Sequence, residues 1–212
     1  MEITLRNETE KDYRRVEEIT REAFWNLYRP GCDEHFTLHR ARLHPDFIPE
    51  LDFVALADGE LAGNIVYTRS WLTDEQGGEL EIVTFGPVCV LPRLQHQGIG
   101  ARLIRHTLQL AAGQGIKAVV ILGDPHNYCR HGFKNAKDLG ISDLEGNHPY
   151  GMLALELEQG ALSGHAWKYR YSTAYEIDEQ EAEAFDQGFE EKEKHWQPSQ
   201  EVFGMQVRAV VR

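Results

Sequence analysis

The chain has 212 residues, of which 42% are hydrophobic and 26% charged, and its formal net charge is −12. This composition is ordinary for a globular protein, and the length suits one large domain or one domain with an extension. The acidic balance argues against sequence-independent binding of nucleic acid, which depends on many Lys and Arg side chains at phosphates. No long apolar run is present, which argues against a membrane-spanning segment. We therefore expect neither nucleic acid nor a membrane as a partner.

Cysteine usage indicates a reducing compartment. Cys32, Cys89 and Cys129 are few and widely spaced, so they imply no disulfide framework. The first residues are polar and do not resemble a secretory signal. We expect a cytoplasmic protein.

Two short Cys/His groupings have spacings that a metal site can use, but neither supplies the fourth ligand of an ordinary zinc site. The sequence therefore predicts no metal. The groupings are Cys32, His35 and His39, and His126, Cys129 and His131.

The N-terminal part predicts one strand and two helices. Residues 2–6 alternate between polar and apolar types, which is typical of a short strand. Thr9 is a suitable N-cap, with Asp12 three residues later, for a helix that extends to about Trp25. A second, weaker helix is predicted over residues 33–43.

The next segment predicts antiparallel strands. Residues 51–57 and 60–72 flank Asp58-Gly59, a dipeptide typical of a tight hairpin turn. The chain returns as a strand over residues 79–92 that is apolar enough to be buried. Gly86-Pro87 in its middle must interrupt or bulge this strand, because proline cannot donate a ladder hydrogen bond.

A helix and a buried strand follow in series. Residues 98–113 carry apolar side chains at helical spacing, and Gly115 suits a left-handed C-cap. Residues 117–123 form a β-branched run typical of a fully buried strand. A strand, a helix and a strand in series predict a parallel pair with a right-handed crossover. Residues 151–157 predict a last core strand.

The character of the chain changes beyond Gln159. Residues 167–177 predict an extra strand, and residues 178–194 carry eight acidic residues and two lysines in a probable helix. The final residues 202–212 are left as a strand or a loose tail. Three aromatic residues, Phe185, Phe189 and Trp196, are expected to dock the acidic helix on the main domain.

These features predict two parts. Residues 1–158 form the main domain, and residues 159–212 form an extension docked on it.

The most informative segment is residues 88–102, where a buried strand ends and a glycine-containing turn leads directly into a helix. Gly98 and Gly100 let a bulky ligand approach the backbone closely. The free N–H groups of the helix start, with the positive end of the helix dipole behind them, form an anion site suited to a pyrophosphate. The segment is neither a P-loop nor a G-x-G-x-x-G dinucleotide motif.

The run Gln95-His96-Gln97-Gly98-Ile99-Gly100 resembles the Q/R-x-x-G-x-G/A motif of the GCN5-related N-acetyltransferase (GNAT) family. Leu91-Pro92 before the motif and Tyr128, four residues before Gly132-Phe133, are similar to the family pattern. The order of elements over residues 1–158 resembles that family throughout, and the chain is similar to a subgroup with C-terminal extensions. The resemblance implies an α/β fold with a mixed (α+β) sheet, the GNAT-like acyl-CoA N-acyltransferase fold with splayed central parallel strands.

The resemblance also implies acetyl-CoA as co-substrate, held between the two splayed strands. The backbone of Val88 to Val90 would pair with the pantetheine arm and polarise the thioester carbonyl. Asn127 would orient the pantetheine amide. The residues implied in cofactor binding are Val88, Cys89, Val90, Gln95, His96, Gln97, Gly98, Ile99, Gly100, Ala101 and Asn127.

Tyr128 would be the general acid that protonates the departing thiolate. The alternative is a buried tyrosine that only packs on the cofactor. Many family members place a glutamate base on the strand before the motif, whereas this chain has Phe85-Gly86-Pro87 there. Glu81 is favoured as the general base. Glu79, Asp124 and His126 stay open as alternatives.

The resemblance implies transfer of an acetyl group to a primary amine of a small molecule or peptide by direct attack, through a tetrahedral intermediate. Cys89 is a poor nucleophile because it should lie inside the strand, where a thiol stays protonated. Two alternatives remain: a non-catalytic acyl-CoA-binding module, and an interaction protein whose acidic helix engages a basic partner. A homodimer stays open as an assembly state.

Overall fold

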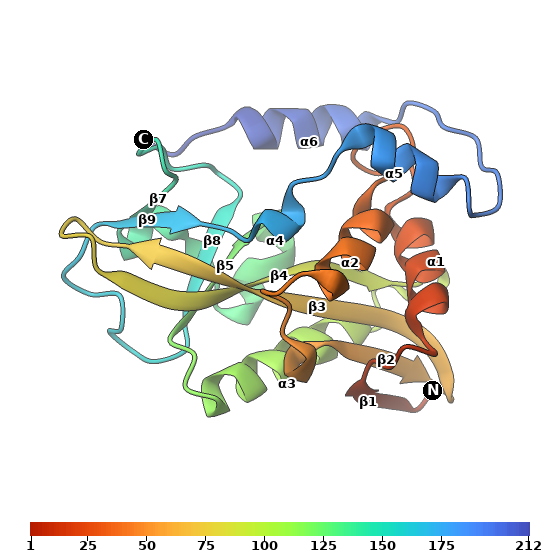
Figure 1. Cartoon of the computed structure of the whole chain (residues 1–212), viewed down its shortest axis with the longest axis horizontal. Coiled ribbons are helices and arrows are strands. Elements are labelled where there is room, and N and C mark those ends of the chain that lie inside the picture. The colour runs from red at the N-terminus through yellow and green to blue at the C-terminus, as the bar shows by residue number, and fades with distance from the viewer.

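The strands predicted from alternating and β-branched runs form one nine-stranded, mostly antiparallel sheet in the computed structural model, which describes residues 1–212 (Figure 1). The strands are β1 (Ile3–Asn7), β2 (Phe53–Ala57), β3 (Glu60–Thr73), β4 (Glu79–Val90), β5 (Ala118–Leu122), β6 (Lys134–Asn135), β7 (Ile141–Ser142), β8 (Met152–Glu156) and β9 (Trp167–Arg170). The helices are α1 (Tyr13–Phe24), α2 (Glu34–Leu43), α3 (Ile99–Gly113), α4 (Pro125–Tyr128), α5 (Glu179–Asp186) and α6 (Pro198–Arg208).

The sheet is built outward from the long β2–β3 hairpin. Its turn residues Asp58 and Gly59 both have positive φ, of 48° and 89°, as a tight hairpin turn requires. The strand order is β1-β2-β3-β4-β5-β8-β6, and β9 pairs with β3 and with β7. β4 and β5 are parallel, which confirms the pairing predicted from the strand, helix and strand in series.

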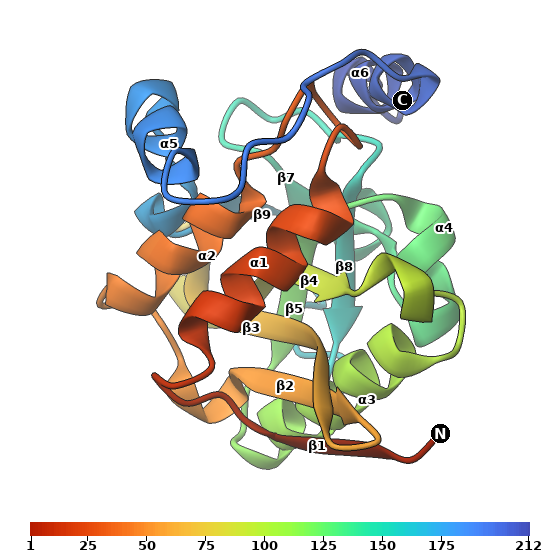
Figure 2. The same cartoon turned by 90° about the vertical axis from the view of Figure 1, so that its right-hand side faces the viewer.

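Helices cover both faces of the sheet (Figure 2). On one face the apolar side of α3 contributes Leu103 and Ile104 to a core shared with Val83 and Phe85 of β4. On the other face α1 and α2 contribute further buried residues, including the fully buried Leu38. Burial of each such side chain stabilises the fold by about 1.5–3 kcal/mol. The apolar face of each helix therefore determines which side of the helix packs on the sheet.

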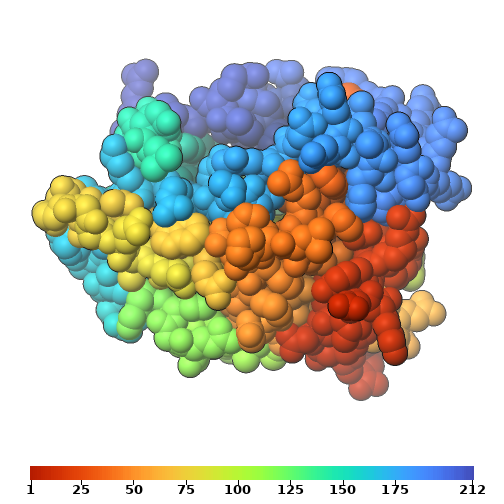
Figure 3. Space-filling view, viewed as in Figure 1, coloured from red at the N-terminus to blue at the C-terminus, as the bar shows by residue number.

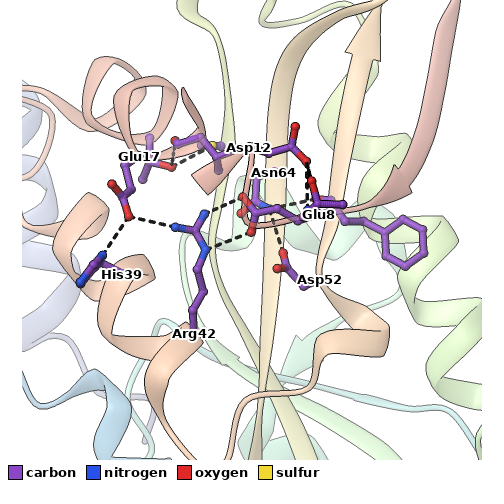
Figure 4. Close-up of polar contacts among 12 residues, drawn as sticks. Glu8, Asp12, Glu17, His39, Arg42, Asp52 and Asn64 are labelled. Atoms are coloured by element: carbon purple, nitrogen blue, oxygen red, sulfur yellow. Dashed lines mark hydrogen bonds and ion pairs between the residues drawn. The ribbon is translucent and has the colours of Figure 1, made fainter. Parts of the chain in front are cut away.

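A buried charged network fastens α1 and α2 to the sheet (Figure 4). Arg42 of α2 donates to both carboxylate oxygens of Glu8, at 2.6 and 3.0 Å, and to Glu17 of α1 at 3.0 Å. The Asn64 amide of β3 donates to Asp52 at 2.9 Å. A buried charge is unfavourable unless it is paired, so this network restricts where α2 can sit.

The C-terminal part follows a path that differs from the predicted one. The acidic helix ends at Asp186. Helix α6 (Pro198–Arg208), with Pro198 in its first turn, takes in much of residues 202–212, which were predicted as a strand or a loose tail. Trp196, expected to dock, is 64% exposed, because polar contacts to Asn26 hold this segment instead. Figure 3 shows the blue C-terminal residues lying against the orange α2 region. No helix is both long and apolar enough to cross a bilayer.

Candidate active site

β4 and β5 diverge at the centre of the sheet. Their parallel pairing is limited to Val83 and Val119. Beyond it, Gly86 and Pro87 stand opposite the single residue Val66 of β3, which is the bulge that the sequence predicts. The last residues of β4 therefore keep β3 as a neighbour on one edge and have no strand partner on the other.

A turn rich in free backbone donors follows β4. His96 and Gly98 have positive φ, of 61° and 84°, and they direct the chain into α3. The N–H groups from His96 to Ala101 form no hydrogen bond within the protein. This row of free donors at a helix N-terminus is an anion site.

The backbone at Gly100 faces open space in front of this turn. A Cβ added there would meet only Val90 Cγ2, at 3.6 Å, so the protein itself does not require glycine. A bulky anionic ligand that approaches the backbone does require it. Gln95 differs from its neighbours: its N–H donates to Pro92 at 3.3 Å, and its side-chain amide donates to the Val90 carbonyl at 3.1 Å.

Tyr128 stands at the end of α4, beside the diverging strands. Its ring lies 5.8 Å from the Phe85 ring of β4. It also lies on Gly123, where a Cβ would be 2.5 Å from the ring and is therefore excluded. The hydroxyl forms no hydrogen bond within the protein. Burial, then Tyr28 and Asp124, raise the pKa of Tyr128, so the phenol stays protonated at neutral pH and can donate a proton.

The other residues implied in cofactor binding lie along the same edge. Val88 and Val90 are half-buried on the outer part of β4, and Asn127 is exposed on α4 next to Tyr128. Cys89 is buried with its sulfur 3.3 Å from Thr20 Oγ1, and burial raises the pKa of its thiol to about 11. The structure thus agrees with the expectation that Cys89 is a poor nucleophile.

Glu81, the predicted general base, lies on β4 before the point at which β4 and β5 diverge. Glu81 is exposed and forms an ion pair of 3.5 Å with Arg69. It precedes Phe85 by four residues on β4, which corresponds to about 13 Å along a strand. Among the alternatives, Asp124 caps α4 by accepting the N–H of His126 at 3.0 Å.

The contact between the α1–α2 loop and α6, made by Tyr28 and Phe203, is not predicted by the sequence. Tyr28 stacks on Phe203 of α6 with ring centroids 4.4 Å apart. Burial first, and then the charges of Glu34 and Asp124, raise the pKa of Tyr28. No local pattern marks these residues, because only the path of the loop and of α6 brings them to the site.

The two Cys/His groupings form no metal site, since no group of three or more metal-ligating side chains is present. His35 Nε2 lies 3.1 Å from Asp186 of α5, and His39 Nδ1 lies 3.0 Å from Glu17. Asp186 also accepts from Arg21 of α1 at 2.6 Å. These histidines therefore help to connect α5, α2 and α1.

Comparison with known proteins extends this picture. The model of the acetyltransferase (GNAT) family matches residues 17–134. YjhQ of Escherichia coli strain K12, described as an uncharacterized N-acetyltransferase, is 34% identical over 86 residues, which make up 41% of this chain and 47% of YjhQ. YhbS of the same strain, described likewise, is 34% identical over 95 residues, 44% of this chain and 55% of YhbS. The chain thus spans about half the length of these relatives.

Solved structures share the fold. The crystal structure of E. coli YhbS in complex with CoA has a TM-score of 0.71 at 23% identity and covers 82% of this chain and 92% of YhbS. A GNAT family acetyltransferase from Brucella melitensis in complex with acetyl-CoA has a TM-score of 0.64 at 26% identity, over 82% of this chain and 98% of that protein. The diverging strands, the free donors of the turn and the family match over more than half of the sequence lead to one conclusion: the chain belongs to the GNAT acetyltransferase family.

Proposed function

We propose that the protein transfers the acetyl group of acetyl-CoA to a primary amine of a small molecule or peptide, by direct attack through a tetrahedral intermediate. The observation that carries this proposal is the row of free N–H groups from His96 to Ala101 at one end of the diverging strands. The Tyr128 phenol, which has no hydrogen-bond partner, lies beside the same strands, with its ring against Phe85 of β4. The complexes of the two related structures with CoA and acetyl-CoA support the choice of co-substrate.

Each group has a role in this proposal. The free edge of Val88 to Val90 pairs with the pantetheine arm, and a strand N–H there stabilises the oxyanion. The turn from His96 to Ala101 binds the pyrophosphate. The side-chain amide of Gln95 instead donates a hydrogen bond to the Val90 carbonyl. Asn127 orients the pantetheine amide and Tyr128 protonates the thiolate. Glu81 stays a prediction as the general base; it is exposed and paired with Arg69.

Acetyl-CoA titration by calorimetry tests the binding site. Gly100→Glu should abolish acetyl-CoA binding, because its side chain fills the pyrophosphate space and its charge repels the ligand. Gly113→Glu is the matched control, since a Cβ at the far end of α3 meets nothing within 4 Å. Equal affinity of the folded Gly100→Glu variant and the control would contradict the binding site.

Release of free CoA in the presence of a panel of amines tests the reaction. The panel contains spermidine, a lysine peptide and a peptide with a free N-terminus. CoA release that depends on an amine supports the transferase. Tight binding of acetyl-CoA without turnover would favour the non-catalytic acyl-CoA-binding module.

A further inference from the structure

We propose that α6 covers the entrance for the amine and restricts the acceptor to a slender, extended molecule, so that amines on the surface of a folded protein are excluded. The proposal rests on the acetyl transfer proposed above and narrows its acceptor class. Contacts at both ends of α6 carry it. They join the helix to the end of β4 on one side and to the end of β5 on the other.

The first series of contacts joins α6 to the end of β4. Phe24, at the end of α1, packs against the apolar cluster that contains Cys89 of β4 and Leu91 directly after it. The Phe24 ring centroid lies 5.8 Å from that of Tyr28, and Tyr28 stacks on Phe203 of α6 at 4.4 Å. Two ring contacts therefore connect α6 with the side chain that packs on the end of β4.

Hydrogen bonds fix the start of α6 to the α1–α2 loop through the buried residue Asn26. The side-chain oxygen of Asn26 accepts the N–H groups of Gly31 at 2.8 Å and of His195 at 3.2 Å. Its side-chain nitrogen donates to the Glu193 carbonyl at 3.0 Å. The Asn26 carbonyl accepts the side-chain amide of Gln200 at 3.0 Å. The same residue thus shapes the loop and holds the chain that leads into α6.

The second series of contacts joins the other end of α6 to Tyr128. The carbonyl of Ala209, directly after α6, accepts the N–H of Tyr150 at 2.9 Å. The carbonyl of the next residue, Gly151, accepts the N–H of Gly123 at the end of β5 at 2.8 Å. The Tyr128 ring lies on Gly123. Two adjacent residues of the loop before β8 therefore hold α6 and the backbone that supports the proposed acid.

Helix α6 thus crosses from the β4 side to the β5 side of the place where these strands diverge. It rises about 14 Å between Gln200 and Ala209. The α1–α2 loop that holds it belongs to the face of the sheet opposite α3, and Figure 1 shows α6 along the top of the molecule and α3 at the bottom. Because the proposed pyrophosphate turn opens α3, the cofactor approaches from the α3 face. The opposite face, which α6 crosses, is left for the amine.

Helix α6 has little part in the core. None of its side chains is buried, and its apolar residues Val202 and Met205 are 50% and 53% exposed. Its half-buried side carries Ser199, Phe203 and Gln206, which share one face at helical spacing. A helix that is fixed at both ends but buries no side chain is suited to cover a site, because it can be displaced without loss of the core.

A cover of this kind selects acceptors by their width. The amine of spermidine, or of a lysine in an unfolded peptide, stands at the end of a thin chain that can pass beneath a helix. A lysine on a folded surface brings its neighbours against α6 before its amine reaches the acetyl group. The difference should appear in kcat/KM, which measures the discrimination between competing substrates.

Gly204, in the middle of α6, offers a matched pair of variants in the full chain. Gly204→Pro breaks the helix, because proline has no N–H and clashes with the preceding turn. Gly204→Ala keeps the helix, since alanine favours it and the added Cβ would lie in ordinary contact, 3.5 Å, with the Arg208 guanidinium. The pair separates the presence of α6 from the change of residue.

The acceptors are the lysine peptide of the panel and a folded carrier protein with surface lysines. We expect the wild type and Gly204→Ala to prefer the peptide by about 10²-fold in kcat/KM, and Gly204→Pro by less than about 10-fold. The affinity for acetyl-CoA should be equal in all three. An equal preference in both variants, or a wild type that acetylates the carrier as fast as the peptide, overturns the proposal while acetyl transfer stands.

A second measurement does not depend on acetyl transfer. CoA is bound by an excess of protein, and mass spectrometry follows the alkylation of its thiol by iodoacetamide and by a maleimide carried on polyethylene glycol. We expect Gly204→Pro to raise the rate with the bulky maleimide about 10-fold, because α6 no longer closes over the site, and to change the iodoacetamide rate little. An unchanged maleimide rate overturns the proposal.

A protein that shields bound CoA in this way but acetylates no amine overturns the proposed function and supports α6 as the cover. If Gly204→Pro does not fold, Gln200→Ala decides the matter, because it removes only the hydrogen bond to the Asn26 carbonyl. It should shift both measurements in the same direction by a smaller factor, and the absence of any shift overturns the proposal.

Discussion

At the scale of single residues, Tyr128 offers the sharpest test of the chemistry. Tyr128→Phe keeps the ring and its contact with Phe85, so the affinity for acetyl-CoA should not change. The acetyl-transfer rate should fall about 10²-fold or more, the usual contribution of a positioned general acid. Stopped-flow detection of free CoA measures this rate. A folded variant with full turnover would show that Tyr128 only packs on the cofactor.

Asp52 is the residue at which pH and stability are linked. Burial raises the pKa of both Glu8 and Asp52, and at neutral pH the pair holds one proton between them. Glu8 contacts Arg42 through both oxygens, so the proton belongs with Asp52. The folded state thus keeps a proton that the unfolded chain releases above about pH 4.

The free energy of unfolding should therefore fall as the pH rises from about 5 to 9, because the folded state binds more protons than the unfolded state over this range. Asp52→Asn replaces the protonated acid with a neutral amide and should flatten this dependence. Urea unfolding at several pH values measures it. An equal slope for the variant and the wild type would show that the proton is not held at this pair.

At the scale of elements, turn residues and the local alternation of apolar and polar residues were sufficient to predict most of the sheet. The β2–β3 hairpin, the parallel β4–β5 pair and the bulge at Gly86-Pro87 follow from turn chemistry and from alternation, which act between near neighbours. The prediction of Thr9 as N-cap was wrong: α1 begins only at Tyr13, with Asp12 in the N-cap position, although the Asp12 carboxylate does accept the Thr9 N–H at 2.9 Å.

The acceptor side of the site was harder to predict for a physical reason. Tyr28 and Phe203 meet through the path of a loop and through the docking of a C-terminal helix. Neither leaves a periodic signal in the sequence.

The helix α6 gives a prediction at this scale. Phe203→Ala removes the ring that stacks on Tyr28, a contact of about 0.5–1.5 kcal/mol. We expect the KM for the amine to rise about 2- to 12-fold, because Tyr28 loses its support, while acetyl-CoA binding stays constant. Steady-state kinetics with each substrate varied in turn measure the two effects. Val207→Ala, at a side chain that is 62% exposed, is the control and should change neither.

At the scale of the whole molecule, we propose that residues 1–158 are the acetyltransferase domain and that residues 159–212 are an extension on which its stability depends. Leu162, Trp167 and Tyr169 of the extension are buried in a core cluster shared with β3, β4, β5 and β8. Truncation after Gln159 should therefore expose this apolar surface and cause aggregation.

Truncation after Gln197 is the matched comparison, since it removes α6 and keeps β9. It should stay soluble, and the two forms are distinguished by their soluble yield and by the binding of a hydrophobic dye. A soluble, stable and fully active protein after truncation at Gln159 would show that the extension is a detached tail.

Helix α6 is fastened at both ends. Near its start Gln200 donates to the Asn26 carbonyl at 3.0 Å, and after its end Val211 donates to the His148 carbonyl at 2.8 Å. Asn26 belongs to the α1–α2 loop, whereas His148 belongs to the loop before β8, in which the Gly151 carbonyl accepts the N–H of Gly123 at the end of β5. The helix therefore connects the α1–α2 loop with the loop before β8, and it cannot swing away while both contacts persist.

A segment tied at both ends opens as one cooperative unit, so its amide protons should exchange with solvent at a common rate. Loss of either tie should quicken exchange along the whole helix, at the distant end as much as at the near one.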